Sequence, residues 1–260
     1  MATVGLCPHP ERDVAAALAK ETSEWLQERG HRAVFLAADS WRDPSMGALN
    51  LAVSLGGDGT MLWTLGMVGR FGVPVLGVHL GRLGFLTPVE PEGLRPALER
   101  FLEGDYLLEP RMTLDISLSG GSGEPELLGQ SALNDVVVER QGGGHTVHAL
   151  VRLRGRPFVS YAADSLIVAT PTGSTAYNLS ARGPIVSPQA QVIVLTPVAP
   201  HSFFDRSIVL DAADSLTLEI VDDRSADLVV DGRAVAVLDP GQLLHCSRGR
   251  RDALLVTFSE

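Results

Sequence analysis

The sequence predicts an α/β protein: an N-terminal α/β domain with a parallel sheet, followed by an all-β, sandwich-like domain. Three observations predict this fold class. Strands and helices alternate over the first hundred residues, which indicates a parallel sheet covered on both faces. From about Arg111 onward, short apolar segments are separated by glycine turns, which favours an antiparallel sandwich. The length of 260 residues suits one large domain or two moderate ones.

The first domain, expected over residues 1–107, begins with a short apolar strand at 3–7. Residues 13–29 have helical spacing and are followed by Gly30, a suitable C′ residue. Four apolar residues of this helix lie near one stripe: Val14, Leu18, Trp25 and Leu26. Further strands are expected at 33–36, 51–55 and 73–78, and helices at 60–68 and 91–102. Pro91 is well placed in the first turn of the last helix.

The second domain, expected over residues 108–246, reads as many short strands. Apolar and polar residues alternate from Leu114 to Leu118, as in a half-buried strand. Asp231-Gly232 joins two apolar runs and predicts a hairpin. The remaining strands are expected at 136–138, 147–153, 166–169, 192–195 and 216–221, with glycine turns at 120–123 and 142–144. A final strand at 254–258 could belong to either domain.

Composition and charge exclude several classes of function. The net charge of −10 argues against a nucleic-acid partner, because phosphate backbones require clustered Lys and Arg. No apolar run approaches the roughly 20 residues of a membrane span, and no signal peptide is evident at the start of the chain. The two cysteines, Cys7 and Cys246, are far apart and are expected to be reduced, buried thiols. We therefore expect a cytoplasmic protein without a membrane partner.

The segment Gly56-Gly57-Asp58-Gly59-Thr60 follows an apolar strand and precedes a helix. Backbone N–H groups at such a helix start favour phosphate. No Lys follows the glycines, so the segment is not a Walker A loop. Asp58 could hold a metal ion, accept a proton from an attacking hydroxyl, or cap the following helix.

Two further segments carry polar groups beside strands. Asn134-Asp135 comes before the strand at 136–138 and could contact a nucleoside, or it could be a plain strand-entry turn. The string Thr170-Pro171-Thr172-Gly173-Ser174-Thr175-Ala176-Tyr177 follows the strand at 166–169. Its hydroxyls and aromatic ring are typical of a nucleotide pocket, and the alternative is a turn with a helix N-cap. Ser180 would share a helical face with Tyr177.

These motifs, together with Pro200-His201-Ser202, occur in the order found in NAD kinases, and the resemblance extends from about residue 50 to 232. NAD kinases phosphorylate the 2′-hydroxyl of the adenosine ribose of NAD to make NADP. The segment from Gly56 to Thr60 is weakly specific, since lipid kinases and phosphofructokinases use similar turns. The string from Thr170 to Tyr177 is strongly specific. The resemblance also suggests that residues 247–260 return to the first domain.

The resemblance implies a role for each matching residue. Asp58 would act on the 2′-hydroxyl, while the donor ATP and Mg²⁺ or another divalent cation would be held at Gly57, Gly59 and Thr60. The residues that would bind NAD are Asn134, Asp135, Asp164, Thr175, Ala176, Tyr177 and Ser180. Phe85 is positioned like a ring that covers the substrate, and Arg82 is a candidate phosphate contact. The family's oligomers imply a homodimer or homotetramer, with one site built from more than one subunit.

The sequence departs from the family's pattern at three positions. Asp135 stands where many members have Glu, Ser165 follows Asp164 where Gly is usual, and Ala162 replaces an Arg found in some relatives. The shorter Asp135 makes its contact less secure than that of Asn134, whereas Asp164 is preserved and should contact the nicotinamide side of NAD. With Ala162, a guanidinium contact to phosphate is absent or supplied elsewhere. No nucleophile and carboxylate accompany His201, which favours a structural or subunit-contact role for that residue.

Two other functions fit parts of the pattern. A lipid kinase of the diacylglycerol or sphingosine type shares the Gly56–Thr60 motif, although the acidic composition offers no basic surface for a membrane. A nucleotide-binding regulatory module would bind NAD without forming NADP. The motifs do not distinguish ATP from polyphosphate as the donor, or NAD from NADH as the acceptor.

Overall fold

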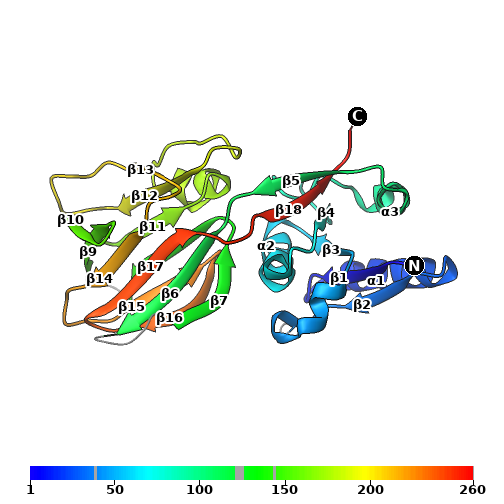
Figure 1. The fold of residues 1–260 in the computed structure, drawn as a ribbon, viewed down its shortest axis with the longest axis horizontal. Helices are drawn as coiled ribbons and strands as arrows, with labels where there is room; N and C mark the ends of the chain where they lie inside the picture. Colours follow the sequence, from blue (N-terminus) through cyan, green and yellow to red (C-terminus); the bar gives the residue numbers. More distant parts are fainter. Residues whose placement is uncertain (38–39, 121–125, 143–144, 260) are drawn as a thin grey trace. The chain divides into compact units, whose positions relative to one another are not determined.

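The computed structural model describes residues 1–37, 40–120, 126–142 and 145–259. The chain forms two compact units, one made of residues 1–110 with 251–260 and the other of residues 111–250 (Figure 1). The glycines expected to form turns at 121, 123, 143 and 144 lie outside the described residues.

The first unit contains a six-stranded sheet with the strand order β2-β1-β3-β4-β18-β5. These strands are β2 (Arg32–Phe35), β1 (Thr3–Pro8), β3 (Leu51–Gly56), β4 (Val75–His79), β18 (Ala253–Thr257) and β5 (Leu107–Arg111). From β2 to β18 neighbouring strands pair in parallel. The C-terminal strand β18, red in Figure 1, thus lies in the sheet of the N-terminal unit.

Helices connect these strands. They are α1 (Asp13–Glu28), α2 (Asp58–Val68) and α3 (Leu94–Glu103), with short 3₁₀ segments η1 (Ser40–Arg42), η2 (Pro44–Ala48), η3 (Gly69–Phe71) and η4 (Pro91–Gly93). Every residue of β3 and β4 is buried, as expected for parallel strands covered on both faces. No helix among the described residues has both the length and the apolar character needed to cross a membrane.

The predicted stripe of α1 is confirmed except at Val14: Trp25 and Leu26 are buried, and Leu18 packs partly buried against the same core. Val14 is 67% exposed, whereas Ala15, Ala19 and Leu26 are fully buried. These three residues follow the spacing i, i+4, i+11 of one helix face, and the small alanines let the helix approach the sheet closely. Gly30 adopts φ +76° after the helix, which confirms its predicted C′ role.

The second unit contains two six-stranded sheets, in which neighbouring strands pair antiparallel. The first sheet comprises β10 (Arg156–Ala163), β9 (Val147–Leu153), β14 (Leu216–Ile220), β17 (Gln242–Arg248), β6 (Leu114–Gly120) and β7 (Glu126–Ala132). The other comprises β13 (Ile208–Asp211), β12 (Val192–Val198), β11 (Ser165–Ala169), β8 (Asp135–Arg140), β15 (Ala226–Val230) and β16 (Arg233–Leu238).

One apolar core draws on both of these sheets. Ile116 and Val151 of the first sheet belong to the same buried cluster as Val136 and Val138 of the second. Val137, between them on β8, points to the opposite face and packs in a separate small cluster. The fold class predicted from the sequence is therefore confirmed, because the second unit is a β-sandwich.

The predicted hairpin at Asp231-Gly232 is present. Asp231 has φ +47° and Gly232 has φ +77°, and the pair joins β15 to β16. Positive φ at both central residues is the feature that makes Asp-Gly favourable in two-residue hairpin turns. Strands β5, β7, β10, β13 and β17 were not predicted.

Candidate functional site

Asp58 lies at the carboxyl end of β3, where it is the first residue of α2. Its carboxylate accepts hydrogen bonds from the backbone N–H of Phe85 (2.9 Å) and of Leu86 (3.0 Å). The Thr87 hydroxyl lies 3.4 Å from the same carboxylate. These contacts connect the loop after β3 with the loop after β4, its parallel neighbour. The side chain is thereby fixed at the edge of the sheet where ligands bind in open α/β folds.

Glycine is required where these two loops meet. A Cβ on Gly84 would overlap the Asp58 carboxylate, and a Cβ on Gly77 would overlap the backbone around Leu86. In contrast, a Cβ on Gly57 or on Gly59 would meet nothing within 4 Å. The space beside Gly57 and Gly59 is therefore open at the helix start, as a phosphate-binding turn requires.

Phe85 and Arg82 lie in the loop that carries the N–H donors to Asp58. Phe85 is 86% exposed, and the side chain of Arg82 is also exposed. Phe85 is therefore no core residue of its own unit. The phenyl ring is open to solvent on the residue whose backbone N–H binds Asp58, so it is available to a ligand.

The Asn134-Asp135 segment and the string from Thr170 to Tyr177 are packed directly together. The Asn134 carbonyl accepts a hydrogen bond from the Thr170 N–H (2.9 Å). The Thr170 hydroxyl in turn donates to the Leu133 carbonyl and accepts from the Gly173 N–H. A Cβ on Gly173 would overlap the Asn134 backbone, so only glycine permits this approach. Two segments predicted separately thus form one structure.

Within the string, the side chains divide into two groups. The hydroxyls of Thr170 and Ser174 are buried and bond to protein carbonyls. Thr175 and Tyr177 are exposed, Tyr177 to 41%, and Ser180 is exposed at the end of α4 (Tyr177–Ser180). The string also contains the 3₁₀ segment η5 (Thr172–Thr175). The exposed group is the one that a ligand could contact.

Asp135 is the electrostatically unusual member of the predicted set. It is only 5% exposed and accepts a hydrogen bond from the Tyr177 backbone N–H. Burial, together with repulsion from the Asp231 carboxylate, raises the pKa of Asp135 to about 7. Burial also raises the pKa of Asp231 above its usual range. Two neighbouring buried carboxylates therefore occur directly beside Asn134 and Tyr177.

Asp231 was predicted only as a turn residue, and no sequence signal indicated the contacts of its carboxylate with another segment. Its carboxylate accepts hydrogen bonds from three consecutive N–H groups, those of Leu133 (2.8 Å), Asn134 (2.7 Å) and Asp135 (3.1 Å). The partners are 96 to 98 residues away along the chain. Because the Asp-Gly turn alone explains an aspartate here, only the fold could reveal these contacts.

Asp164 lies away from this group. In the pairing of β8 with β11, Asp135 is opposite Ala169 and Glu139 is opposite Ser165. Asp164 is next to Ser165 and therefore opposite Arg140, six residues along β8 from Asn134. Asn134 and Asp164 thus flank opposite ends of the paired strands, roughly 20 Å apart at 3.3–3.4 Å per residue. The Asp164 carboxylate lies 3.5 Å from Nε of Arg140 at the far end of β8.

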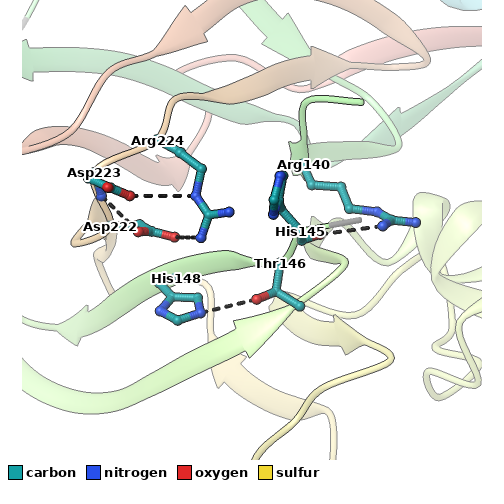
Figure 2. A network of polar contacts seen from close by, with 7 residues as sticks. All are labelled: Arg140, His145, Thr146, His148, Asp222, Asp223 and Arg224. Atoms are coloured by element: carbon teal, nitrogen blue, oxygen red, sulfur yellow. Dashed lines mark hydrogen bonds and ion pairs between the residues drawn. The ribbon is translucent and has the colours of Figure 1, made fainter. Parts of the chain in front are cut away.

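A cavity of about 190 Å³ lies at this far end. Figure 2 shows the polar residues around it: Arg140 donates to the His145 carbonyl, and His148 lies within 3.1 Å of the Thr146 hydroxyl. Arg224 pairs with Asp222 (3.0 Å) and Asp223 (3.5 Å) in the turn after β14. Both arginines that line the cavity are thus neutralised by carboxylates of the chain. The exposed His201 is placed by its N–H, which donates to the Ala162 carbonyl (2.7 Å).

The comparison with known proteins matches both units to domains of one family. The family model for the ATP-NAD kinase N-terminal domain matches residues 42–106, and that for the ATP-NAD kinase C-terminal domain matches residues 133–258. An NAD kinase of Geotalea daltonii is 39% identical over 250 residues, covering 92% of this chain and 87% of the relative. An NAD kinase of Heliobacterium modesticaldum is 39% identical over 267 residues, covering 98% and 90%.

Solved structures of related kinases have a similar fold. A yeast NADH kinase complexed with NADH has the same fold, with a TM-score of 0.83 and 24% identity over 100% of this chain and 84% of that one. An NAD kinase from Archaeoglobus fulgidus in complex with ATP superposes with a TM-score of 0.74 and 25% identity, covering 98% of this chain and 92% of that one. Because the relatives exceed 30% identity over nearly the whole chain, this chain belongs to the NAD kinase family.

Proposed function

We propose that this chain transfers the terminal phosphoryl group of ATP to the 2′-hydroxyl of the adenosine ribose of NAD, giving NADP and ADP. The observation that carries the proposal is the placement of Asp58 in a chain of this family. The carboxylate is held by two backbone N–H groups at the end of a buried parallel strand. Oδ1 accepts from the Leu86 N–H and the Thr87 hydroxyl, whereas Oδ2 accepts only from the Phe85 N–H and keeps a lone pair that can accept a further proton.

In the proposed reaction the ribose 2′-oxygen attacks the terminal phosphorus of ATP. The new bond joins that oxygen to phosphorus, and the bond between phosphorus and the bridging oxygen of ADP breaks. The proton of the 2′-hydroxyl passes to Asp58. Phosphoryl transfer depends mostly on positioning and charge neutralisation, and a fixed carboxylate supplies the positioning of the hydroxyl.

The residues proposed to bind NAD are those of the packed segments in the second unit. Asn134, Asp135, Thr175, Ala176, Tyr177 and Ser180 form this group. Two observations support this assignment: the two segments pack directly together, and Thr175 and Tyr177 are exposed. Because the carboxyl of Asp135 is buried and engaged by the Tyr177 N–H, we assign it to shaping the pocket as well as to contacting the ribose.

The donor phosphates are assigned to Gly57, Gly59 and Thr60 with Mg²⁺. A Cβ on either glycine would meet open space, and α2 begins at this point. The described residues contain no group of three His, Cys, Asp or Glu side chains that could hold a metal by themselves. This suits Mg²⁺, which commonly binds through one or two carboxylates plus substrate phosphates. When bound, the ion would neutralise phosphate charge.

The position of Asp164 bears on the oligomer. Given its distance from Asn134, Asp164 would reach NAD either at the far end of an extended dinucleotide or in a second copy of the chain. We therefore retain the homodimer or homotetramer implied by the family, with Asp164 and Tyr177 as candidates for shared contacts. We place the protein in the cytoplasm, in keeping with two buried cysteines, Cys7 and Cys246, neither of which forms a disulfide.

The proposal is tested by Asp58→Asn in an assay that follows NADP formation. We expect turnover to fall by about 10² or more, while the affinity for NAD changes by no more than several-fold. Asp223→Asn, in an exposed turn of the second unit, is the matched control and should leave turnover unchanged. Thermal unfolding of both variants shows whether the fold is kept.

The same assay with other substrates distinguishes the NAD kinase from a lipid kinase and from a regulatory module. The comparisons give no support to the lipid kinase alternative, which predicts phosphorylation of diacylglycerol and none of NAD. A regulatory module would bind NAD without producing NADP, and Asp58→Asn would then change nothing. Replacing ATP with polyphosphate, and NAD with NADH, defines the donor and the acceptor.

A further inference from the structure

Asp231 combines two features that a hairpin turn does not require. Its carboxylate is directed away from its own turn, toward the backbone that immediately precedes and begins β8. Its own N–H also donates to the Asp135 carbonyl (3.0 Å), so Asp231 and this segment exchange bonds in both directions. A turn of this type needs only positive φ at its two central residues, which Asn or Gly also provides.

The three accepted bonds demand a carboxylate. A carboxylate has two acceptor oxygens with about four lone-pair sites, enough for three N–H donors. An amide at the same position has one acceptor oxygen, and its NH₂ group would face at least one backbone N–H. A buried N–H left without a partner is costly, so the segment would shift or loosen.

The anchored backbone is the one that carries the proposed NAD ligands. Asn134 is the central residue of the three that Asp231 holds, and its carbonyl accepts the Thr170 N–H. Asp135 is the third, and its side chain accepts the Tyr177 N–H. A movement of residues 133–135 would therefore displace both segments of the pocket together. Arg233, two residues after Asp231, adds a favourable charge.

We propose that Asp231 is a positioning residue for NAD: its buried carboxylate fixes the backbone of Leu133 to Asp135, and through it the orientation of Asn134 and Tyr177. The inference rests on the proposed function, because it concerns the site where NAD is proposed to bind. Asp231 touches neither substrate nor reacting atoms. Its substitution should therefore weaken NAD binding more than it slows phosphoryl transfer.

The test compares Asp231→Asn with Gly232→Ala. Gly232→Ala strains the same turn, because Gly232 has φ +77°, but it keeps the carboxylate. We expect Asp231→Asn to raise KM for NAD at least tenfold, with kcat and KM for ATP changing less than threefold. Hydrogen exchange of the amides at 133–135 should accelerate at least tenfold. Gly232→Ala should leave KM for NAD within threefold of wild type.

Equal effects of the two variants on KM for NAD would overturn the inference, as would unchanged exchange at 133–135 in Asp231→Asn. If the Asn variant does not fold, Asp231→Glu keeps the charge on a longer side chain. A Glu variant that binds NAD as tightly as wild type despite accelerated exchange at 133–135 would also overturn it. Failure of the wild-type chain to make NADP would instead refute the proposed function, while hydrogen exchange and direct NAD titration still decide the role of Asp231.

Discussion

Asp135→Asn is the substitution whose effect on stability can be worked out most fully from the structure. Asp135 is 5% exposed, and burial and the neighbouring Asp231 raise its pKa from 3.8 to about 7. Between these pH values the folded protein keeps a proton that the unfolded chain has already lost. Stability must therefore fall as pH rises from about 4 to about 7, and this contribution must become constant above pH 7.

The magnitude follows from the same two values. One pKa unit corresponds to about 1.4 kcal/mol, so the difference between 3.8 and about 7 amounts to about 4 kcal/mol, as an order of magnitude. The Asn side chain carries no charge at any of these pH values. Its amide oxygen can still accept the hydrogen bond from the Tyr177 N–H. The Asn variant should therefore not show the loss of stability that wild type shows between about pH 4 and about pH 7.

Urea unfolding at several pH values between 4 and 8.5 measures this effect. We expect the Asn variant to be about as stable as wild type near pH 4 and more stable by a few kcal/mol at pH 8. Asp223→Asn, at an exposed turn, should show a difference from wild type that does not change in this way with pH. The reasoning would be refuted if the difference in the free energy of unfolding between Asp135→Asn and wild type did not change with pH. It would also be refuted if the variant were less stable than wild type at pH 8.

Three further substitutions have defined expectations. Gly173→Ala places a Cβ against the Asn134 backbone and should lower the free energy of unfolding by about 3 kcal/mol or more, measured by urea unfolding. Tyr161→Phe removes a buried hydroxyl that has no hydrogen-bond partner among the described residues; stability should be unchanged or higher by about 1 kcal/mol in the same assay. Gly84→Ala pushes a Cβ into the Asp58 carboxylate, so NADP formation should fall more than tenfold, and full activity would contradict the placement of Asp58.

The sequence predicted the fold class because the strands that define it are long apolar runs. All of β3 and β4 is buried, and such runs stand out without any knowledge of neighbours. The strands that were missed lack this signal. In β17 only Leu244 and Cys246 are buried, and β13 has four residues with one buried. Pairing with distant strands, rather than local pattern, makes these segments extended.

In the predicted stripe of α1 only Val14 was wrong, for a related reason. Helical spacing placed Val14 in the stripe, while the structure leaves it exposed and buries Ala15 and Ala19 in the same core as Trp25 and Leu26. Small side chains can occupy the contact between a helix and a sheet, so the spacing of large apolar residues missed these two alanines. The candidate site shows the same limit, since the contacts of Asp231 span almost a hundred residues.

The unusual composition of the string from Thr170 to Tyr177 has two physical causes. Thr170 and Ser174 are fully buried, and their hydroxyls satisfy carbonyl groups of the protein. Gly173 is required by the close approach of the Asn134 backbone. Thr175 and Tyr177, in contrast, are exposed and free to meet a ligand. A turn that must satisfy buried backbone on one side and, in the proposed function, receive a nucleoside on the other has little freedom in its sequence. Both demands together explain why this segment is so specific to the family.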